Sequence, residues 1–171
     1  MSLTKPKKIL SIDPGISGAF ALASPTKLIK TWKMPPLDKE GLPDLQAIFS
    51  FASKHKSYII LEEQSTRRGN SIRSAFNHGK GYGYLLCLIH SSGLDFELVS
   101  PKGKEGWINS IPEINPAHNY PHKTKKTKIK TSEFAIANYS NSKNVIWGPR
   151  GGFNDGVADA IAMAAYYYKV K

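Results

Sequence analysis

Acidic residues, cysteine and long apolar runs are all scarce in this chain. Its 171 residues include 13 Asp and Glu against 24 Lys and Arg, and one cysteine. A single cysteine excludes an internal disulfide and favours a reducing, cytoplasmic environment. Because Cys87 stands in an apolar segment, we expect a buried structural thiol. No run approaches the ~20 apolar residues of a membrane span, and the apolar run after the basic N-terminus is too short for a signal peptide, so we expect no membrane association.

The familiar nucleotide-binding signatures and internal repeats are also missing. The segment Gly79–Gly83 reads Gly-Lys-Gly-Tyr-Gly, which has neither the Lys-Ser/Thr pair of a Walker motif nor the spacing of the dinucleotide fingerprint. There is no internal repeat and no low-complexity tract. The length suits one domain over residues 1–171 with a core of its own and leaves little room for a second.

Positive charge is plentiful. The formal net charge of +11 indicates a polyanionic partner. The densest run, residues 122–130, has five lysines and no acid, and Arg67-Arg68 and Lys102 with Lys104 form smaller clusters. A solvated segment is an equally ordinary interpretation of a lysine run taken alone.

Apolar periodicity predicts alternating strands and helices. Strand patterns cover residues 8–13, 18–23, 28–33, 58–63 and 95–99. Helical patterns begin at Pro43 and cover 82–91, 129–139 and 155–168, with a short helix around Trp107. Residues 34–43, 65–80 and 144–153 are expected to be loops. This order of elements indicates a three-layer α/β domain.

The few acids lie at the ends of these apolar segments. Asp13 ends the first strand, Glu62 and Glu63 end the strand at 58–63, and Asp155 and Asp159 share one face at the start of the last helix. Carboxylates gathered there would repel one another and lose hydration unless cations neutralised them. Two divalent cations held by carboxylates are suited to phosphodiester hydrolysis. Taken singly, each acid has a plain structural interpretation, such as a helix cap or a solvent-facing group.

Small residues after Asp159 strengthen the case for one shared site. Such residues let a helix pack closely against a sheet, which would bring the first turn of the helix toward the strand ends that carry Asp13 and Glu62. The small residues are Ala160, Ala162, Ala164 and Ala165.

Three motifs in this order resemble the RuvC-like Holliday junction resolvases of the ribonuclease H-like superfamily. They are Asp13-Pro14-Gly15 after an apolar strand, Glu62-x-Gln64, and Asp155-Gly-x-Ala-Asp159-Ala. The middle of the chain is similar to the phage and organellar branch, through residues 74–79, Gly81-Tyr82-Gly83, and 98–101 with Trp107. The resemblance covers nearly the whole chain and implies a ribonuclease H-like fold, with a mixed five-stranded sheet and helices on both faces.

The resemblance also implies a metal site. Four acids of the family hold two Mg²⁺ or Mn²⁺ ions, and the motifs place them at Asp13, Glu62, Asp155 and Asp159. Glu63 is the alternative to Glu62, because bacterial members carry Glu-Gln directly. The phage-type Glu-x-Gln spacing favours Glu62, and Glu63 would then face the other side of its strand. Bacterial members often carry an acid or His where Gly156 stands, whereas the four-residue spacing of the two aspartates matches the phage type.

The activity implied is resolution of four-way DNA junctions by paired symmetric nicks. One ion would activate a water and the other would stabilise the leaving 3′-oxygen, which leaves a 5′-phosphate and a 3′-hydroxyl. A homodimer would match the two-fold symmetry of the junction, and the apolar segment Tyr84–Ile89 is a candidate interface, with a core role as its ordinary interpretation. Phe76 is expected either to stack on a base or to anchor its loop. The expected DNA contacts are Arg67, Arg68, Arg73, Phe76, Lys80, Lys102, Lys123, Lys125, Lys126, Lys128 and Lys130.

Other interpretations stay open. A broader branched-DNA or RNA–DNA hybrid nuclease would use the same site, and a non-catalytic junction-binding protein would keep the basic surface. Sugar kinases and actin-like ATPases share a turn like Asp13–Gly18, but they need two such domains to enclose a nucleotide. The compact chain and the branch that it resembles suggest a phage or another virus as the source.

Overall fold

Five strands form one mixed sheet in the computed structural model, which describes residues 5–65 and 71–171. The strand order is β3-β2-β1-β4-β5. The first three strands pair antiparallel, and β4 and β5 continue the sheet in parallel with β1. Each predicted strand is confirmed to within one residue. The strands are β1 (Ile9–Asp13), β2 (Ala19–Ala23), β3 (Leu28–Lys33), β4 (Tyr58–Glu62) and β5 (Phe96–Val99).

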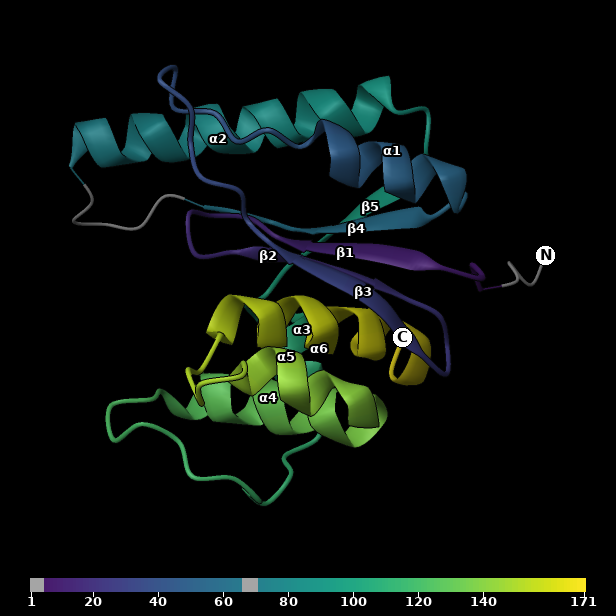
Figure 1. Ribbon diagram of the computed structural model, residues 1–171, viewed down its shortest axis with the longest axis vertical. Coiled ribbons are helices and arrows are strands. Elements are labelled where there is room, and N and C mark those ends of the chain that lie inside the picture. The colour runs from purple at the N-terminus through teal and green to yellow at the C-terminus, as the bar shows by residue number, and fades with distance from the viewer. Residues whose placement is uncertain (1–4, 66–70) are drawn as a thin grey trace.

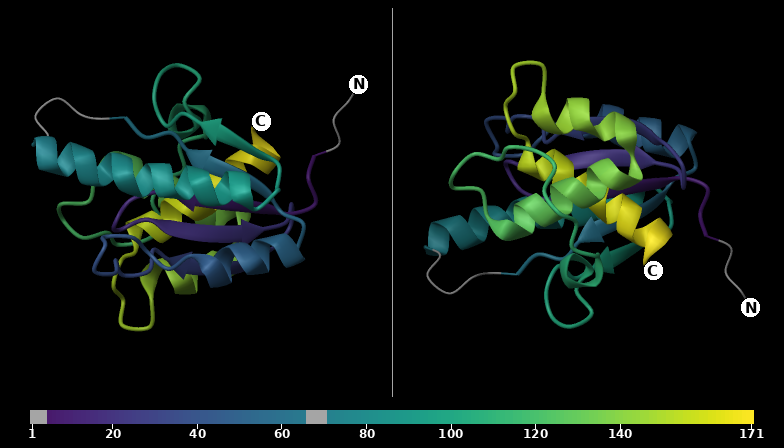
Figure 2. Two further views of the ribbon diagram at one scale, coloured as in Figure 1. Left: turned by 90° about the horizontal axis from the view of Figure 1, so that it is seen from above. Right: turned by 90° about the horizontal axis from the view of Figure 1, so that it is seen from below.

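Helices cover both faces of the sheet, which confirms the three-layer α/β architecture (Figure 1). One face is covered by α1 (Gln46–Lys54) and α2 (Ile72–Ser91), and the left panel of Figure 2 shows this face from above. The helices of the other face are α3 (Trp107–Ser110), α4 (Lys126–Asn138), α5 (Lys143–Trp147) and α6 (Asp155–Lys169), with a 3₁₀ turn at Ser140–Ser142.

Strand alternation divides the core between these two faces. In β1, Ile9 belongs to the cluster under α6, while Leu10 and Ile12 belong to the cluster under α1 and α2. The Ser11 hydroxyl points toward α6 and donates a hydrogen bond to the Ala160 carbonyl at 2.6 Å. Small side chains on both partners make this close approach possible, as predicted. They are Ala19, Ala21 and Ala23 of β2 and Ala158, Ala162 and Ala165 of α6, all fully buried.

Two predicted loops are partly helical. The helix α2 begins ten residues before the predicted start, with Ser71 as its N-cap, whose hydroxyl accepts a hydrogen bond from the Ser74 amide at 3.2 Å. Two glycines in this stretch, Gly79 and Gly81, disfavour a helix, but the Ser71 cap and the buried C-terminal half of the helix outweigh them. Similarly, α5 occupies the start of the predicted loop 144–153. The helix α4 begins three residues before its predicted start, and α6 matches its predicted range to within one residue.

The prediction for Cys87 is wrong, because its side chain is exposed. In α2 the buried positions are Leu85 and Ile89, one turn apart, so a residue midway between them points away from the sheet. No helix within residues 5–65 and 71–171 is both long and apolar enough to cross a membrane.

Candidate active site

Asp13 and Glu62 lie at the carboxyl ends of two adjacent parallel strands, β1 and β4. By strand alternation, Asp13 shares the face of Ser11, and Glu62 shares the face of Ile60, so both acids point to the α6 side of the sheet. Glu63, the next residue, lines a hollow at the β5 edge, and Asp13, Asp155 and Asp159 are not among the residues that line this hollow. The geometry therefore favours Glu62 over Glu63 as the partner of Asp13.

A glycine contact brings the first turn of α6 against the turn that follows Asp13. A Cβ atom at Gly156 would stand 2.1 Å from the Ser17 carbonyl oxygen, far inside van der Waals contact. The backbone can approach this closely only because Gly156 has no side chain. This contact carries Asp155 and Asp159, on one face of the helix, to the end of β1.

The pKa of Asp13 shows that the four acids interact. Burial first, then repulsion by Asp159 and Glu62, raises the pKa of Asp13 from 3.8 to about 8, with a smaller contribution from Asp155; Lys128 opposes the rise. No hydrogen bond or ion pair to the Asp13 carboxylate is formed within residues 5–65 and 71–171. Simultaneous ionisation of all four acids would therefore be poorly compensated by their protein surroundings, and the Asp13 carboxyl instead retains a proton near neutral pH.

Lys128 of α4 places a positive charge among these acids. Its ammonium group forms a salt bridge with Asp159 and lies 3.5 Å from the Asp155 Oδ2 atom. Burial alone would lower the pKa of Lys128, but the nearby carboxylates, Asp159 above all, raise it overall. Burial raises the pKa of Asp159, although the lysine and the Thr131 hydroxyl, which donates to Asp159 Oδ1 at 2.6 Å, oppose this.

The Glu62 carboxylate is held from two sides. The buried Trp107 indole N–H donates to Glu62 Oε2 at 3.0 Å, and the Gln64 amide donates to Oε1 at 3.3 Å. Gln64 is in turn hydrogen-bonded to His78 of α2, with 2.7 Å between Gln64 Oε1 and His78 Nε2. These contacts fix the orientation of the carboxylate.

The donor set fits hard divalent cations. Carboxylate oxygens are the ligands that Mg²⁺ and Mn²⁺ prefer, and the raised pKa of Asp13 indicates that a cation would be stabilising there. As the side chains stand, no three Asp, Glu, His or Cys residues of the described ranges converge to a metal-binding distance. The ammonium group of Lys128 stands beside two of the acids, so metal binding would require that lysine to withdraw.

The predicted DNA-contact residues lie in several places. Arg73 and Lys80 line a cavity beside the Pro14–Gly15 turn, and Lys102 lines the hollow that contains Glu63. Phe76 stands on α2 rather than on the predicted loop and is 69% exposed. Figures 1 and 2 show that the N-terminal half of α2 projects past the sheet.

The lysine run of residues 122–130 leads into α4, and within it Lys128 is the residue that contacts the acids. Exposed lysines precede it, and a half-buried one follows it on the same helix. They are Lys123, Lys125, Lys126 and Lys130. Arg67 and Arg68 lie outside the described residues.

Sequence reasoning missed several of the residues that orient the acids. Thr131 and the link from Gln64 to His78 had no signal in the spacing, and Trp107 was part of a motif without an assigned role. These contacts join segments that are distant in sequence, so a one-dimensional pattern does not reveal them.

Comparison with known proteins identifies the fold of this chain. No family model and no curated protein matches the chain. Among solved structures, it is similar to Thermus thermophilus RuvC, with a TM-score of 0.56 and 16% identity over 94% of both chains. It is also similar to T. thermophilus RuvC in complex with Holliday junction substrate, with a TM-score of 0.57 and 14% identity over 94% of this chain and 93% of that chain. The chain has a RuvC-like fold. The predicted ribonuclease H-like class with its mixed five-stranded sheet is thereby confirmed.

Proposed function

We propose that this protein is a metal-dependent DNA endonuclease that resolves four-way junctions by paired symmetric nicks. The observation that carries this proposal is that the ends of β1 and β4 and the first turn of α6 meet at one end of the sheet, which brings together Asp13, Glu62, Asp155 and Asp159. A chain with a net charge of +11 is suited to a nucleic-acid backbone. The likeness of the fold to a RuvC solved with a Holliday junction supports branched DNA as the substrate.

The four carboxylates would hold two Mg²⁺ or Mn²⁺ ions. Bound there, the cations would supply Lewis-acid activation of water and charge stabilisation for hydrolysis to a 5′-phosphate and a 3′-hydroxyl. Trp107 and Gln64 orient the Glu62 carboxylate, while Thr131 orients that of Asp159, so both side chains would be held in place for a cation. The residues that would bind the ions are Asp13, Glu62, Asp155 and Asp159.

Lys128 has two roles in this proposal. In the metal-free protein it neutralises the aspartates of α6, with its ammonium group beside both carboxylates. Once displaced from them, the same ammonium group is placed to contact a DNA phosphate next to the site. The other lysines of residues 122–130, together with Arg73, Lys80 and Lys102, would extend the phosphate contacts over the surface.

The resolvase proposal includes a homodimer and a kinship with the phage and organellar branch. A four-way junction has two-fold symmetry and must be cut in two strands, which two copies of one active site accomplish. The four-residue spacing of Asp155 and Asp159 supports the branch, and Gly156 is consistent with it, because a side chain there would collide with the Ser17 carbonyl.

A cleavage assay on a labelled four-way junction with Mg²⁺ tests the activity. We expect the wild type to make symmetric paired nicks, and Asp13→Asn to bind the junction without cutting it. Asp95→Asn is a matched control, because Asp95 is an exposed acid outside the site, and it should cut as the wild type does. Equal cutting by Asp13→Asn would refute the site. A preference for duplex DNA or for an RNA–DNA hybrid would keep the site and overturn the substrate.

The choice between the neighbouring glutamates has its own comparison. Glu62→Gln should abolish cutting, because it removes charge from the carboxylate that Trp107 orients. Glu63→Gln should retain cutting, because Glu63 is exposed and lies away from the three aspartates. Loss of activity in Glu63→Gln alone would show that Glu63 is the ligand.

A further inference from the structure

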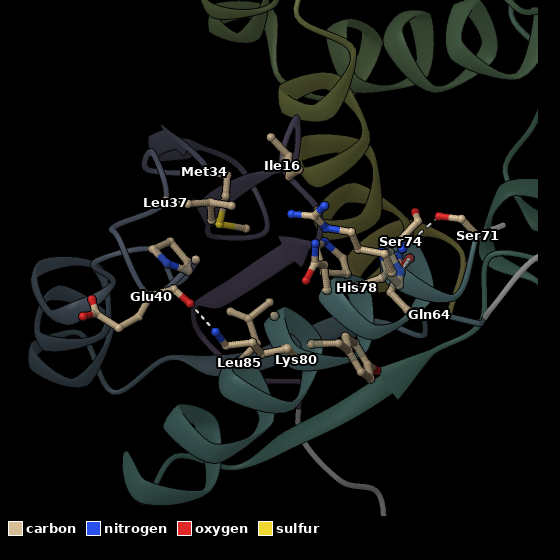
Figure 3. A pocket seen from close by; sticks show the side chains of 18 residues that line it. Ile16, Met34, Leu37, Glu40, Gln64, Ser71, Ser74, His78, Lys80 and Leu85 are labelled. Carbon is tan, nitrogen blue, oxygen red and sulfur yellow. Dashed lines mark hydrogen bonds between the residues drawn. The ribbon is translucent and has the colours of Figure 1, made fainter.

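A cavity of about 500 Å³ lies beside the candidate active site, on the α2 side of the strand ends. Three segments form its walls: the turn after β1, the connection from β3 to α1, and the N-terminal half of α2 (Figure 3). The Lys80 ammonium group joins two of these walls by donating a hydrogen bond to the Glu40 carbonyl. The volume of the cavity falls within the ~300–1,000 Å³ typical of small-ligand sites.

The lining has apolar walls and one polar edge. Ile16, Met34 and Leu37 supply apolar surface from two different segments, and Ile16 is 83% exposed at the mouth. Along α2, Asn77 and His78 supply hydrogen-bonding groups (His78 is labelled in Figure 3). A nucleobase has the matching shape, with two apolar faces and a polar edge that amide and imidazole groups can bind.

The charge of the rim favours a base that is attached to a phosphate backbone. Arg73 and Lys80 stand on the cavity lining, and the single acid among its described residues, Glu40, uses its backbone carbonyl to accept from Lys80. An anionic strand can therefore pass along the rim while one base enters.

The cavity and the acids share a wall. Pro14 and Gly15, which line the cavity, directly follow Asp13. Gln64 lines the cavity as well, and it bonds Glu62 on one side and His78 on the other. A base in the cavity would thus lie next to the scissile phosphate at the candidate active site.

We propose that this cavity takes one unpaired nucleobase from the DNA strand that is to be cut. The inference rests on the proposed junction-cutting function and adds to it a determinant of where the cut falls. A branch point supplies such a base at low cost, because the bases there are already poorly stacked. The rate of cutting will then depend on the base at one position near the scissile phosphate.

Fluorescence of 2-aminopurine tests this directly. The analogue is placed in turn at each position around the branch of a four-way junction, and the wild-type protein is added in EDTA, so that binding is observed without cutting. We expect the emission to rise severalfold at one position, as that base leaves the stack for aliphatic walls. Leu37→Trp should abolish the rise by filling the cavity, since Leu37 is 46% exposed on its lining. Val170→Trp is the matched control, because Val170 is an exposed residue of similar exposure outside the cavity.

Cleavage in Mg²⁺ supplies the second measurement. An abasic site at the responding position should slow wild-type cutting by about tenfold, as expected for the loss of the contacts of one base, and abasic sites at other positions should not. Asn77→Ala should change the preferred base there, whereas Asn115→Ala, at an exposed position away from the cavity, should not.

The outcomes separate this inference from the proposed function. Binding and cutting of the junction with no responding position, and with Leu37→Trp as active as the wild type, would overturn the cavity assignment and leave the resolvase proposal standing. Absence of junction binding and cutting would overturn both. Binding of a free deoxynucleoside monophosphate that Leu37→Trp abolishes, without any 2-aminopurine response, would assign the cavity to a free nucleotide and overturn the inference.

Discussion

Gly156→Ala is the sharpest perturbation of the contact between α6 and the turn after Asp13. The added Cβ would stand 2.1 Å from the Ser17 carbonyl oxygen, which is more than 1 Å short of ordinary contact. Overpacking of this kind costs roughly 1–3 kcal/mol, while replacing a helical glycine by alanine returns about 0.5–1 kcal/mol. At the centres of these two ranges, we therefore expect the free energy of unfolding to fall by about 1 kcal/mol.

The assay is equilibrium unfolding in denaturant together with thermal melting. For a chain of this length, about 1 kcal/mol corresponds to roughly 2–4 °C in Tm. Gly83→Ala is the matched control, because Gly83 is also helical but has no atom within 4 Å of its would-be Cβ. It should stabilise the protein by about 0.5–1 kcal/mol. The same substitution thus has opposite signs at the two sites.

The Gly156→Ala variant should also lose activity. Relief of the collision moves the first turn of α6, which carries Asp155 and Asp159, and a displacement of about 1 Å at a catalytic site can cost on the order of 100-fold in rate. A Gly156→Ala protein that is as stable and as active as the wild type would refute the close approach of the helix to this turn.

Three further predictions concern the acids and their partners. Trp107→Phe keeps a buried ring but removes the N–H that orients Glu62, so the Mg²⁺ concentration for half-maximal cutting should rise about tenfold. Trp147→Phe is the control, because the Trp147 indole N–H is buried without a partner within residues 5–65 and 71–171. A rise in both variants would contradict the orienting role of Trp107. The raised pKa of Asp13 means that the folded protein binds a proton that the unfolded chain releases between pH 4 and about 8, so the stability of the metal-free protein should fall as pH rises through that range. In urea unfolding at several pH values, Asp13→Asn should show a weaker fall, and an unchanged slope would contradict this assignment. Lys128→Met should lower the stability of the metal-free protein and tighten Mg²⁺ binding severalfold in calorimetry, because the ammonium group competes with the cation for carboxylates; weaker binding would show that the lysine does not compete.

The strands and the acids were accessible from the sequence because both depend on local order. The apolar runs predicted the boundaries of β1 and β4, and the ends of these runs predicted the positions of Asp13 and Glu62. The pairing of Glu62 with Trp107 joins residues 45 positions apart, and that of Asp159 with Thr131 joins residues 28 apart. Such contacts depend on how the layers pack, which periodicity does not encode.

Local rules also misjudged α2. Gly79 and Gly81 disfavour a helix, because glycine has low helix propensity, yet the helix runs from Ile72 through both. Its exposed first half has no core to gain, so the Ser71 cap and continuity with the buried second half stabilise it. This extension forms one wall of the cavity next to the acids. The N-terminal half of α2, which the sequence pattern did not predict as helix, is therefore also part of the proposed DNA-binding surface.

The position of Lys128 makes metal binding and DNA binding interdependent in the proposed function. Its ammonium group and a divalent cation compete for the same carboxylate oxygens of Asp155 and Asp159. A DNA phosphate that attracts Lys128 away from them removes the competitor, so the junction should tighten cation binding. Linkage requires the reverse by the same factor: cations should tighten junction binding, because they release the lysine and neutralise the acids that repel the phosphate. The small number of acids in so basic a chain then has a direct consequence, since the carboxylates that stay ionised without cations repel a DNA strand at the site.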